Sequence, residues 1–368
     1  MKNFSYWKKQ HESERLEEFN LDTHGLLWLK IKSIARKDIL VDFANRNNIQ
    51  LKETSLSAQF VELYDALARN PSKSHRILDG FIHMINDNQA AKLNADQLVS
   101  ELYKMKVFDW GGDYQNSLDK YLVTHYVKAL RSYDTLMSKF ETEINIAVQG
   151  YVLNSWYNHW SSILVEHIFK SHKAVLPTVG QIKHVDFFIR NIPFDLKVTY
   201  LPAEYIKDAR KKEGLPVELT YLKTKAMEMD ITFDRHGKPN DIQYEITEKL
   251  KDRNDEHSRS VLDTLRKQKL KILAEAKDNP QILAKWLYEN QGEMRFGSEN
   301  RIFIVLVDTE DFENSWKLKR NSDLLRPAII RYLNAFGDKK LNNLKISFKY
   351  KDKPQTFTSL TDMIFVVK

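Results

Sequence analysis

The stretch HVDFFIRNIPFDLKVT, residues 184–199, decides the fold of this chain. It predicts two short strands joined by a tight connection at residues 191–193, because apolar residues dominate both sides of that connection. Asp186, Asp195 and Lys197 interrupt the apolar pattern. Burying such charges is unfavourable unless they pair or bind a metal ion. The sequence therefore marks these three side chains as candidates for a functional site.

The alternation of side chains along a strand places Asp195 and Lys197 on one face of the second strand. Antiparallel pairing of the two strands would bring Asp186 within reach of both. Carboxylates suit Mg²⁺, a hard ion that prefers oxygen ligands. A lysine beside them can orient or deprotonate a water molecule, or stabilise a transition state. The hairpin therefore predicts metal-dependent hydrolysis of phosphodiester bonds.

An acid on one strand, Asp186, followed by Asp195-Leu196-Lys197 on the next, resembles the PD-(D/E)xK nuclease superfamily, which includes most type II restriction endonucleases. Val185 stands where the superfamily name has proline, a position that varies among members. The resemblance implies that Asp186, Asp195 and the Leu196 carbonyl bind Mg²⁺, and that Lys197 positions or activates the attacking water. It also implies a restriction-endonuclease-like core of α/β class, with α+β as the alternative, in which helices flank a mixed central sheet.

The family often has a glutamate on the preceding helix that helps to bind the metal ion. Glu166 would match this residue, and Glu143 is the alternate. The resemblance further implies that the chain acts on double-stranded DNA. A homodimer is the expectation by analogy, because cutting both strands of a duplex usually takes two active sites.

The acid–any–lysine pattern occurs three times in this chain, at residues 195–197, 275–277 and 338–340. The second copy falls in a predicted charged helix and the third in a predicted turn, so we expect both to be solvated. Only the first has apolar strands around it and an acid on the strand before. The alternative is an amphipathic hairpin whose charges face water, with Asp195 and Lys197 as an ordinary surface pair of little energetic weight.

Two regions follow from the spacing of apolar residues. Residues 1–140 predict a helical N-terminal region, because apolar residues recur every three or four positions. We expect this region to contact DNA or to mediate dimerisation. Residues 141–368 predict the nuclease core, beginning with a long helix that ends near residue 169. Pro177 and Gly180 predict the end of helical structure before the strands begin.

Further elements of the core are predicted from the same patterns. The expected helices span residues 261–276, 282–288 and 322–336, and the expected strands span residues 301–308, 344–350 and 363–367. The strand at 301–308 is almost wholly apolar, as in a strand buried on both faces. Residues 231–246 suggest a second hairpin around a turn at 236–240.

Composition excludes several classes of function. The chain has no cysteine, which rules out disulfides, thiolate nucleophiles and cysteine-ligated metal sites. It has no Gly-rich phosphate-binding loop, so we expect no nucleotide cofactor. It shows neither a signal peptide nor a membrane span, so we expect a cytoplasmic protein with no membrane contact. The formal net charge of +7 and the basic stretches at residues 207–212 and 249–271 are compatible with DNA contact.

Two other functions stay open from sequence. The same fold could serve a repair or recombination nuclease, or a nuclease directed at RNA. The chain could also be a non-catalytic nucleic-acid-binding protein, which would bind in a salt-sensitive manner without dependence on a metal ion.

Overall fold

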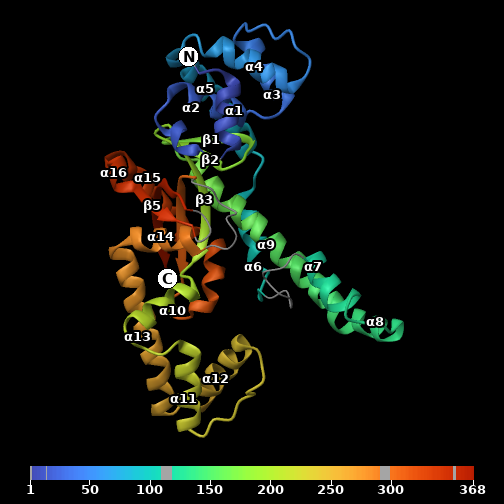
Figure 1. Cartoon of the computed structure of the whole chain (residues 1–368), viewed down its shortest axis with the longest axis vertical. Coiled ribbons are helices and arrows are strands. Elements are labelled where there is room, and N and C mark those ends of the chain that lie inside the picture. The colour runs from blue at the N-terminus through green and yellow to red at the C-terminus, as the bar shows by residue number, and fades with distance from the viewer. Residues whose placement is uncertain (1, 14, 109–117, 291–298, 351–353) are drawn as a thin grey trace. The chain divides into compact units, whose positions relative to one another are not determined.

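The computed structural model describes residues 2–13, 15–108, 118–290, 299–350 and 354–368 (Figure 1). The chain divides into two compact units. Unit 1 comprises Met1–Trp7, Phe19–Pro193 and Asn314–Gly337, and unit 2 comprises Lys8–Glu18, Phe194–Glu313 and Asp338–Lys368. Each unit is therefore assembled from segments that are distant in sequence.

The described residues before residue 145 form only helices and their connections, which confirms the predicted helical region. These elements are α1 (Phe4–Glu12), η1 (Leu16–Asn20), α2 (Thr23–Ser33), α3 (Lys37–Arg46), α4 (Leu56–Leu67), α5 (Pro71–Ala90), α6 (Ala95–Tyr103), α7 (Leu118–Leu122), the π-helical η2 (Val123–Val127), α8 (Tyr133–Lys139) and the π-helical η3 (Phe140–Ile144). Side chains of Asp22, Ser55, Asn70, Asn94 and Ser132 accept hydrogen bonds from the first turns of α2, α4, α5, α6 and α8. These caps supply partners to N–H groups that a helix leaves unpaired.

Unit 1 is built around aromatic residues and one long helix. The fully buried rings of Trp7 and Phe19 lie 4.9 Å apart, centre to centre. The long helix α9 (Asn145–Lys170) precedes strands β1 (Val175–Ile182) and β2 (Val185–Ile189). Phe169 at the end of α9 stacks on Phe187 of β2, with ring centres 4.9 Å apart. This contact packs the helix against the first half of the predicted hairpin.

Strand β1 occupies residues that the sequence assigns to the break before the strands. Pro177 lies inside β1, opposite Phe187 of β2. A proline is tolerated there because β1 is the edge strand of the sheet. At Gly180, an added Cβ would lie 2.7 Å from the carbonyl oxygen of Ser33, so the strand needs glycine for its close approach to α2. Helical structure does end before these residues, at Lys170, but the strand β1 that contains Pro177 and Gly180 was not predicted.

The hairpin turn consists of Arg190 and Asn191, one residue earlier than predicted. Strand β3 (Ile192–Tyr200) begins directly after it. Arg190 and Asn191 both have positive φ, of 50° and 63°, as a two-residue turn of the primed type requires. The fully buried Lys30 of α2 donates hydrogen bonds of 2.9 Å to Asn191 Oδ1 and to Asp79 Oδ2. A buried cation thus holds the turn.

Six strands form a mixed sheet in the order β1-β2-β3-β4-β6-β5. Strand β3 runs parallel to β4 (Arg301–Val307), which runs parallel to β6 (Thr356–Val367). Strand β5 (Lys345–Lys349) pairs antiparallel with β6. All residues of β4 are buried, as predicted for a strand covered on both faces. The mixed α/β class is confirmed, whereas the restriction-endonuclease-like core stays a prediction.

The remaining helices are α10 (Ala203–Lys212), α11 (Glu218–Glu228), α12 (Pro239–Arg253), α13 (Glu256–Asp278), α14 (Pro280–Asn290), η4 (Phe312–Arg320), α15 (Ser322–Ala335), η5 (Phe336–Asp338) and α16 (Leu341–Leu344). In unit 2, residues of α10, α13 and α14 pack on Phe303, Val305 and Met363 of the sheet. The N-terminal half of α13 packs with α11 and α12 in a second core (Figure 1). One long helix therefore belongs to both cores of unit 2.

The hairpin predicted at residues 231–246 is wrong. Residues from Pro239 onward form α12, and Pro239 stands in its first turn, where a missing N–H costs nothing. Ile242, Ile246 and Leu250 recur every four residues and are buried against α11 and α13. The predicted strand ended at residue 246, but the four-residue spacing continues to Leu250, and the longer helical pattern is the one that the chain follows.

Candidate functional site

Asp195 and Lys197 lie side by side on β3, in unit 2. The Lys197 ammonium donates a hydrogen bond to Asp195 Oδ1, with 2.9 Å between Nζ and Oδ1. The Asp195 side chain is 11% exposed and that of Lys197 is 34% exposed. The predicted placement on one face is confirmed. A mostly buried carboxylate thus stands beside an ammonium that solvent can reach.

Arg301 completes this site from the neighbouring strand. It lies directly opposite Asp195 in the parallel pairing of β3 and β4. Its Nε donates to Asp195 Oδ2 at 3.1 Å, and its Nη2 donates to Glu299 Oε2 at 2.9 Å. The Tyr288 ring of α14 lies 4.9 Å from the guanidinium, and the Tyr288 hydroxyl donates to the Glu299 carbonyl at 2.7 Å. Four charged groups therefore alternate in sign along one chain of contacts.

This alternating network makes burial of the charges possible. Arg301 and Glu299 are each 1% exposed. Two cations and two anions give a formal charge of zero, so each ion has a compensating neighbour. Burial raises the pKa of the Tyr288 hydroxyl, which therefore stays protonated as a donor. The network thus holds the Asp195 side chain in a fixed orientation.

Prediction from sequence misses Arg301 and Glu299. Arg301 begins a run of apolar residues, and Glu299 stands two residues before it. The signal that singles out Asp186 and Asp195, a charge within an apolar strand, also applies to Arg301. Its role depends on the register between β3 and β4, which are about a hundred residues apart in sequence.

Asp186 and Glu166, the other predicted site residues, belong to unit 1. Asp186 is half-buried on β2, and its backbone carbonyl accepts a hydrogen bond of 2.9 Å from Thr178 Oγ1. Glu166 on α9 accepts a hydrogen bond of 2.9 Å from Lys170, one helical turn later. Glu143, the alternate, accepts hydrogen bonds from Lys139 and from the Tyr126 hydroxyl. Among the predicted site residues, Asp195 and Lys197 are the pair that the structure brings into contact within one unit.

Lys319 of η4 adds a buried cation near Glu166. It is 7% exposed, and its ammonium lies 3.3 Å from the carbonyl oxygen of Asn158. Burial lowers the pKa of Lys319 to about 8, against an opposing effect of the Glu166 charge. Glu166 therefore interacts electrostatically with Lys319, a lysine that loses its proton more readily than an exposed lysine does.

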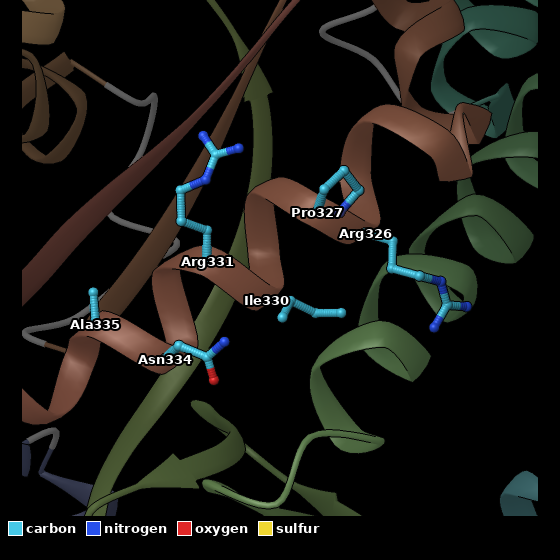
Figure 2. Close-up of a pocket in the computed structure, with 6 residues that line it drawn as sticks. All are labelled: Arg326, Pro327, Ile330, Arg331, Asn334 and Ala335. Atoms are coloured by element: carbon cyan, nitrogen blue, oxygen red, sulfur yellow. The ribbon is translucent and has the colours of Figure 1, made fainter.

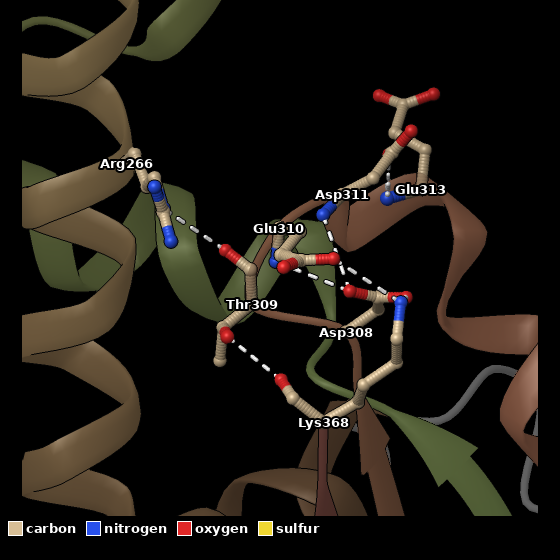
Figure 3. Close-up of polar contacts among 7 residues, drawn as sticks. All are labelled: Arg266, Asp308, Thr309, Glu310, Asp311, Glu313 and Lys368. Carbon is tan, nitrogen blue, oxygen red and sulfur yellow. Dashed lines mark hydrogen bonds and ion pairs between the residues drawn. The ribbon is translucent and has the colours of Figure 1, made fainter.

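Among the described residues, no three or more His, Asp or Glu side chains gather as a metal-binding group. Acidic residues do follow one another after β4, at Asp308, Glu310, Asp311 and Glu313 (Figure 3). Asp308 Oδ1 accepts backbone N–H groups of Glu310 and Asp311, and Oδ2 accepts from the Lys368 ammonium at 3.1 Å. This carboxylate closes the turn after β4 and is not assigned to a metal.

The two basic stretches largely compensate their own charge. Lys207, Lys249, Lys267, Lys269 and Lys271 each form an ion pair with a glutamate or aspartate of unit 2, at 2.6 to 2.9 Å. Arg210 is buried and donates to the Pro216 carbonyl at 2.9 Å. Such pairs weaken the field that would attract a polyanion. These stretches therefore support DNA contact less than their composition suggests.

A hollow along α15 of unit 1 contains two arginines, Arg326 and Arg331, which differ from the paired lysines of unit 2. It is lined by Arg326, Pro327, Ile330, Arg331, Asn334 and Ala335. The guanidinium groups of Arg326 and Arg331 point away from each other (Figure 2). Both arginines are exposed, and neither forms an ion pair with a residue in the described part of the chain. They are better placed for phosphate contacts than the paired lysines of unit 2.

None of the helices in the described residues has the length and apolar character of a membrane span. Comparison with known proteins gives no family to which the chain can be assigned: no protein-family model, curated protein or solved structure matches it.

Proposed function

We propose that this chain is a Mg²⁺-dependent endonuclease of the PD-(D/E)xK type that hydrolyses phosphodiester bonds of double-stranded DNA. Within that type it most resembles a sequence-specific type II restriction enzyme or a similar phage-defence nuclease. The observation that carries the proposal is the contact of Lys197 with Asp195 on β3, at 2.9 Å. An acid and a lysine held together on one strand are two of the groups that such hydrolysis uses.

The proposed ligands are carboxylate and carbonyl oxygens, which are the atoms that Mg²⁺ prefers. Mg²⁺ is often bound through one or two carboxylates, with water and substrate phosphate oxygens completing its shell. In unit 2, Asp195 and the Leu196 carbonyl would hold the ion, and the resemblance assigns the same role to Asp186 and Glu166. The bound ion would lower the pKa of a water ligand and offset charge on the reacting phosphate.

Lys197 has the exposure that its proposed role needs. About a third of its side chain is accessible, so its ammonium can meet a phosphate or a water molecule. There it would position the attacking water, or stabilise negative charge as the bond breaks. Asp195 is held between Lys197 and Arg301, so its carboxylate is oriented before substrate arrives. Orientation in advance avoids reorganisation during the reaction.

Cleavage of plasmid and phage DNA tests the proposal. We expect the wild type to cut with Mg²⁺, and Asp195→Asn and Lys197→Met to lose at least about a hundredfold in rate, as loss of a general acid or base does. The matched control is Glu275→Gln with Lys277→Met, which removes the same pattern from exposed positions of α13. The proposal is wrong if the wild type never cuts across varied substrates, or if the β3 variants cut as well as the control.

A further inference from the structure

Most of the large apolar side chains that are exposed in unit 1 lie on residues 118–156, here called the apolar arm. It comprises α7, η2, α8, η3 and the first part of α9 (Figure 1). Of eighteen large apolar side chains that are exposed among the described residues, ten belong to the arm. Val127, Tyr133, Ile146 and Val152 are each more than half exposed. Apolar surface gathered in this way usually marks an interaction site.

The arm has few buried side chains of its own. Tyr126 and Ile144 are buried, and the Tyr126 hydroxyl donates to Glu143 Oε2 at 3.3 Å. Short helices with so small a core are marginal in water, because most helical stability comes from packing of an apolar face. A partner that covers the arm would supply the missing packing.

Charge indicates which partner fits. Residues 118–131 carry three basic and one acidic side chain, a formal charge of +2, and residues 132–156 carry one basic and three acidic side chains, a formal charge of −2. The whole arm is therefore neutral, which does not favour a polyanion such as DNA. An arrangement of two identical arms about a two-fold axis can place the basic half of each against the acidic half of the other, which makes the surface self-complementary.

The charges that would meet in this arrangement are available. Lys128 and Arg131 of the basic half, and Asp134 and Glu141 of the acidic half, are exposed. None of these four forms an ion pair with a residue that the structure describes. We propose that the apolar arm is the contact surface of a homodimer, in which two copies of this chain pack their arms antiparallel about a two-fold axis.

Sedimentation velocity of the full chain over a dilution series tests this proposal. No DNA or Mg²⁺ is needed, so the result does not depend on the proposed nuclease activity. We expect a dimer that dissociates on dilution. The double variant Val152→Ala, Leu153→Ala should raise the dissociation constant about tenfold or more, because each copy would lose two exposed apolar side chains from the contact surface. Leu21→Ala, at an 87% exposed position outside the arm, is the control and should leave it unchanged.

Charge exchange makes the test specific for the antiparallel arrangement. Lys128→Glu with Arg131→Glu gives both halves a negative charge, and Asp134→Lys with Glu141→Lys gives both a positive charge. Each pair of changes should weaken the dimer, and all four together should restore it, with circular dichroism confirming equal helix content. A wild type that is monomeric at every concentration overturns the proposal. So does a dimer that the arm variants leave intact, or a fourfold variant no stronger than either pair.

Discussion

Arg301 donates a hydrogen bond to Asp195 across the parallel strands β3 and β4, with 3.1 Å between Nε and Oδ2. The same guanidinium binds Glu299, so a single buried cation bridges two carboxylates. The acid that we propose as a metal ligand is thus built into the core of unit 2. Stability and activity should consequently respond to the same residues.

Arg301→Ala should lower the free energy of unfolding by about 3–5 kcal/mol, since it removes the buried cation that contacts both Asp195 and Glu299. Urea denaturation at neutral pH measures this change. Arg235→Ala is the matched control, because Arg235 is exposed, and its effect should stay within about 0.5 kcal/mol. An Arg301→Ala variant as stable as the control would show that the network has no energetic role.

Lys319 should make stability depend on pH in a defined window. Its folded pKa of about 8 lies below the ordinary value of 10.5. Between these values the unfolded state binds more protons, so the free energy of unfolding should rise with pH. The rise should amount to about 3 kcal/mol and be complete above the unfolded pKa.

Urea denaturation from pH 7 to 11 isolates this effect when Lys319→Met is compared with the wild type. The variant should lack the rise and be the more stable protein below pH 8, apart from the lost hydrogen bonds to Asn158. Lys173→Met, at an exposed position, should follow the wild type. Parallel pH curves for wild type and Lys319→Met would contradict a depressed pKa.

The helix acid can be identified by comparing Glu166→Gln with Glu143→Gln. Under the proposed function, Glu166→Gln should reduce the cleavage rate about tenfold or more and raise the Mg²⁺ concentration needed for half-maximal rate. Glu143→Gln should leave both near the wild-type values. Initial rates across a Mg²⁺ titration give the answer, and the reverse pattern would assign the role to Glu143.

Asn191 should contribute to stability in two separable ways. Asn191→Gly keeps the positive φ but removes the acceptor of Lys30, which should cost about 1.5–3 kcal/mol, as for hydrogen bonds to charged groups. Asn191→Ala should cost about 1 kcal/mol more, because alanine disfavours positive φ.

Asn48 provides the control for this pair of variants. It also has a positive φ, of 54°, and its side chain has no hydrogen bond to a described residue. Asn48→Gly should therefore change the unfolding free energy little, as measured in urea. Equal effects of Asn48→Gly and Asn191→Gly would mean that the Lys30 contact contributes nothing.

Periodic patterns predicted those elements in which local preference and packing agree. The helices at 261–276 and 322–336 and the strand at 301–308 are confirmed as α13, α15 and β4. In each of them, one spacing of apolar residues continues over several turns or a whole strand. The strand at 175–182 was not predicted, because proline and glycine usually mark turns but are tolerated in an edge strand. The hairpin at 231–246 was predicted wrongly, because Pro239 stands in the first turn of a helix.

By itself, the sequence determined that Asp195 and Lys197 share a face, because side chains alternate along any strand. It also determined the helical N-terminal region and the acidic and basic halves of the apolar arm. Only the tertiary structure decided that Arg301 and Glu299 accompany Asp195, and that the basic stretches of unit 2 are largely neutralised. Both depend on pairing between residues far apart in the chain, and no local periodicity encodes which distant strands or helices will meet.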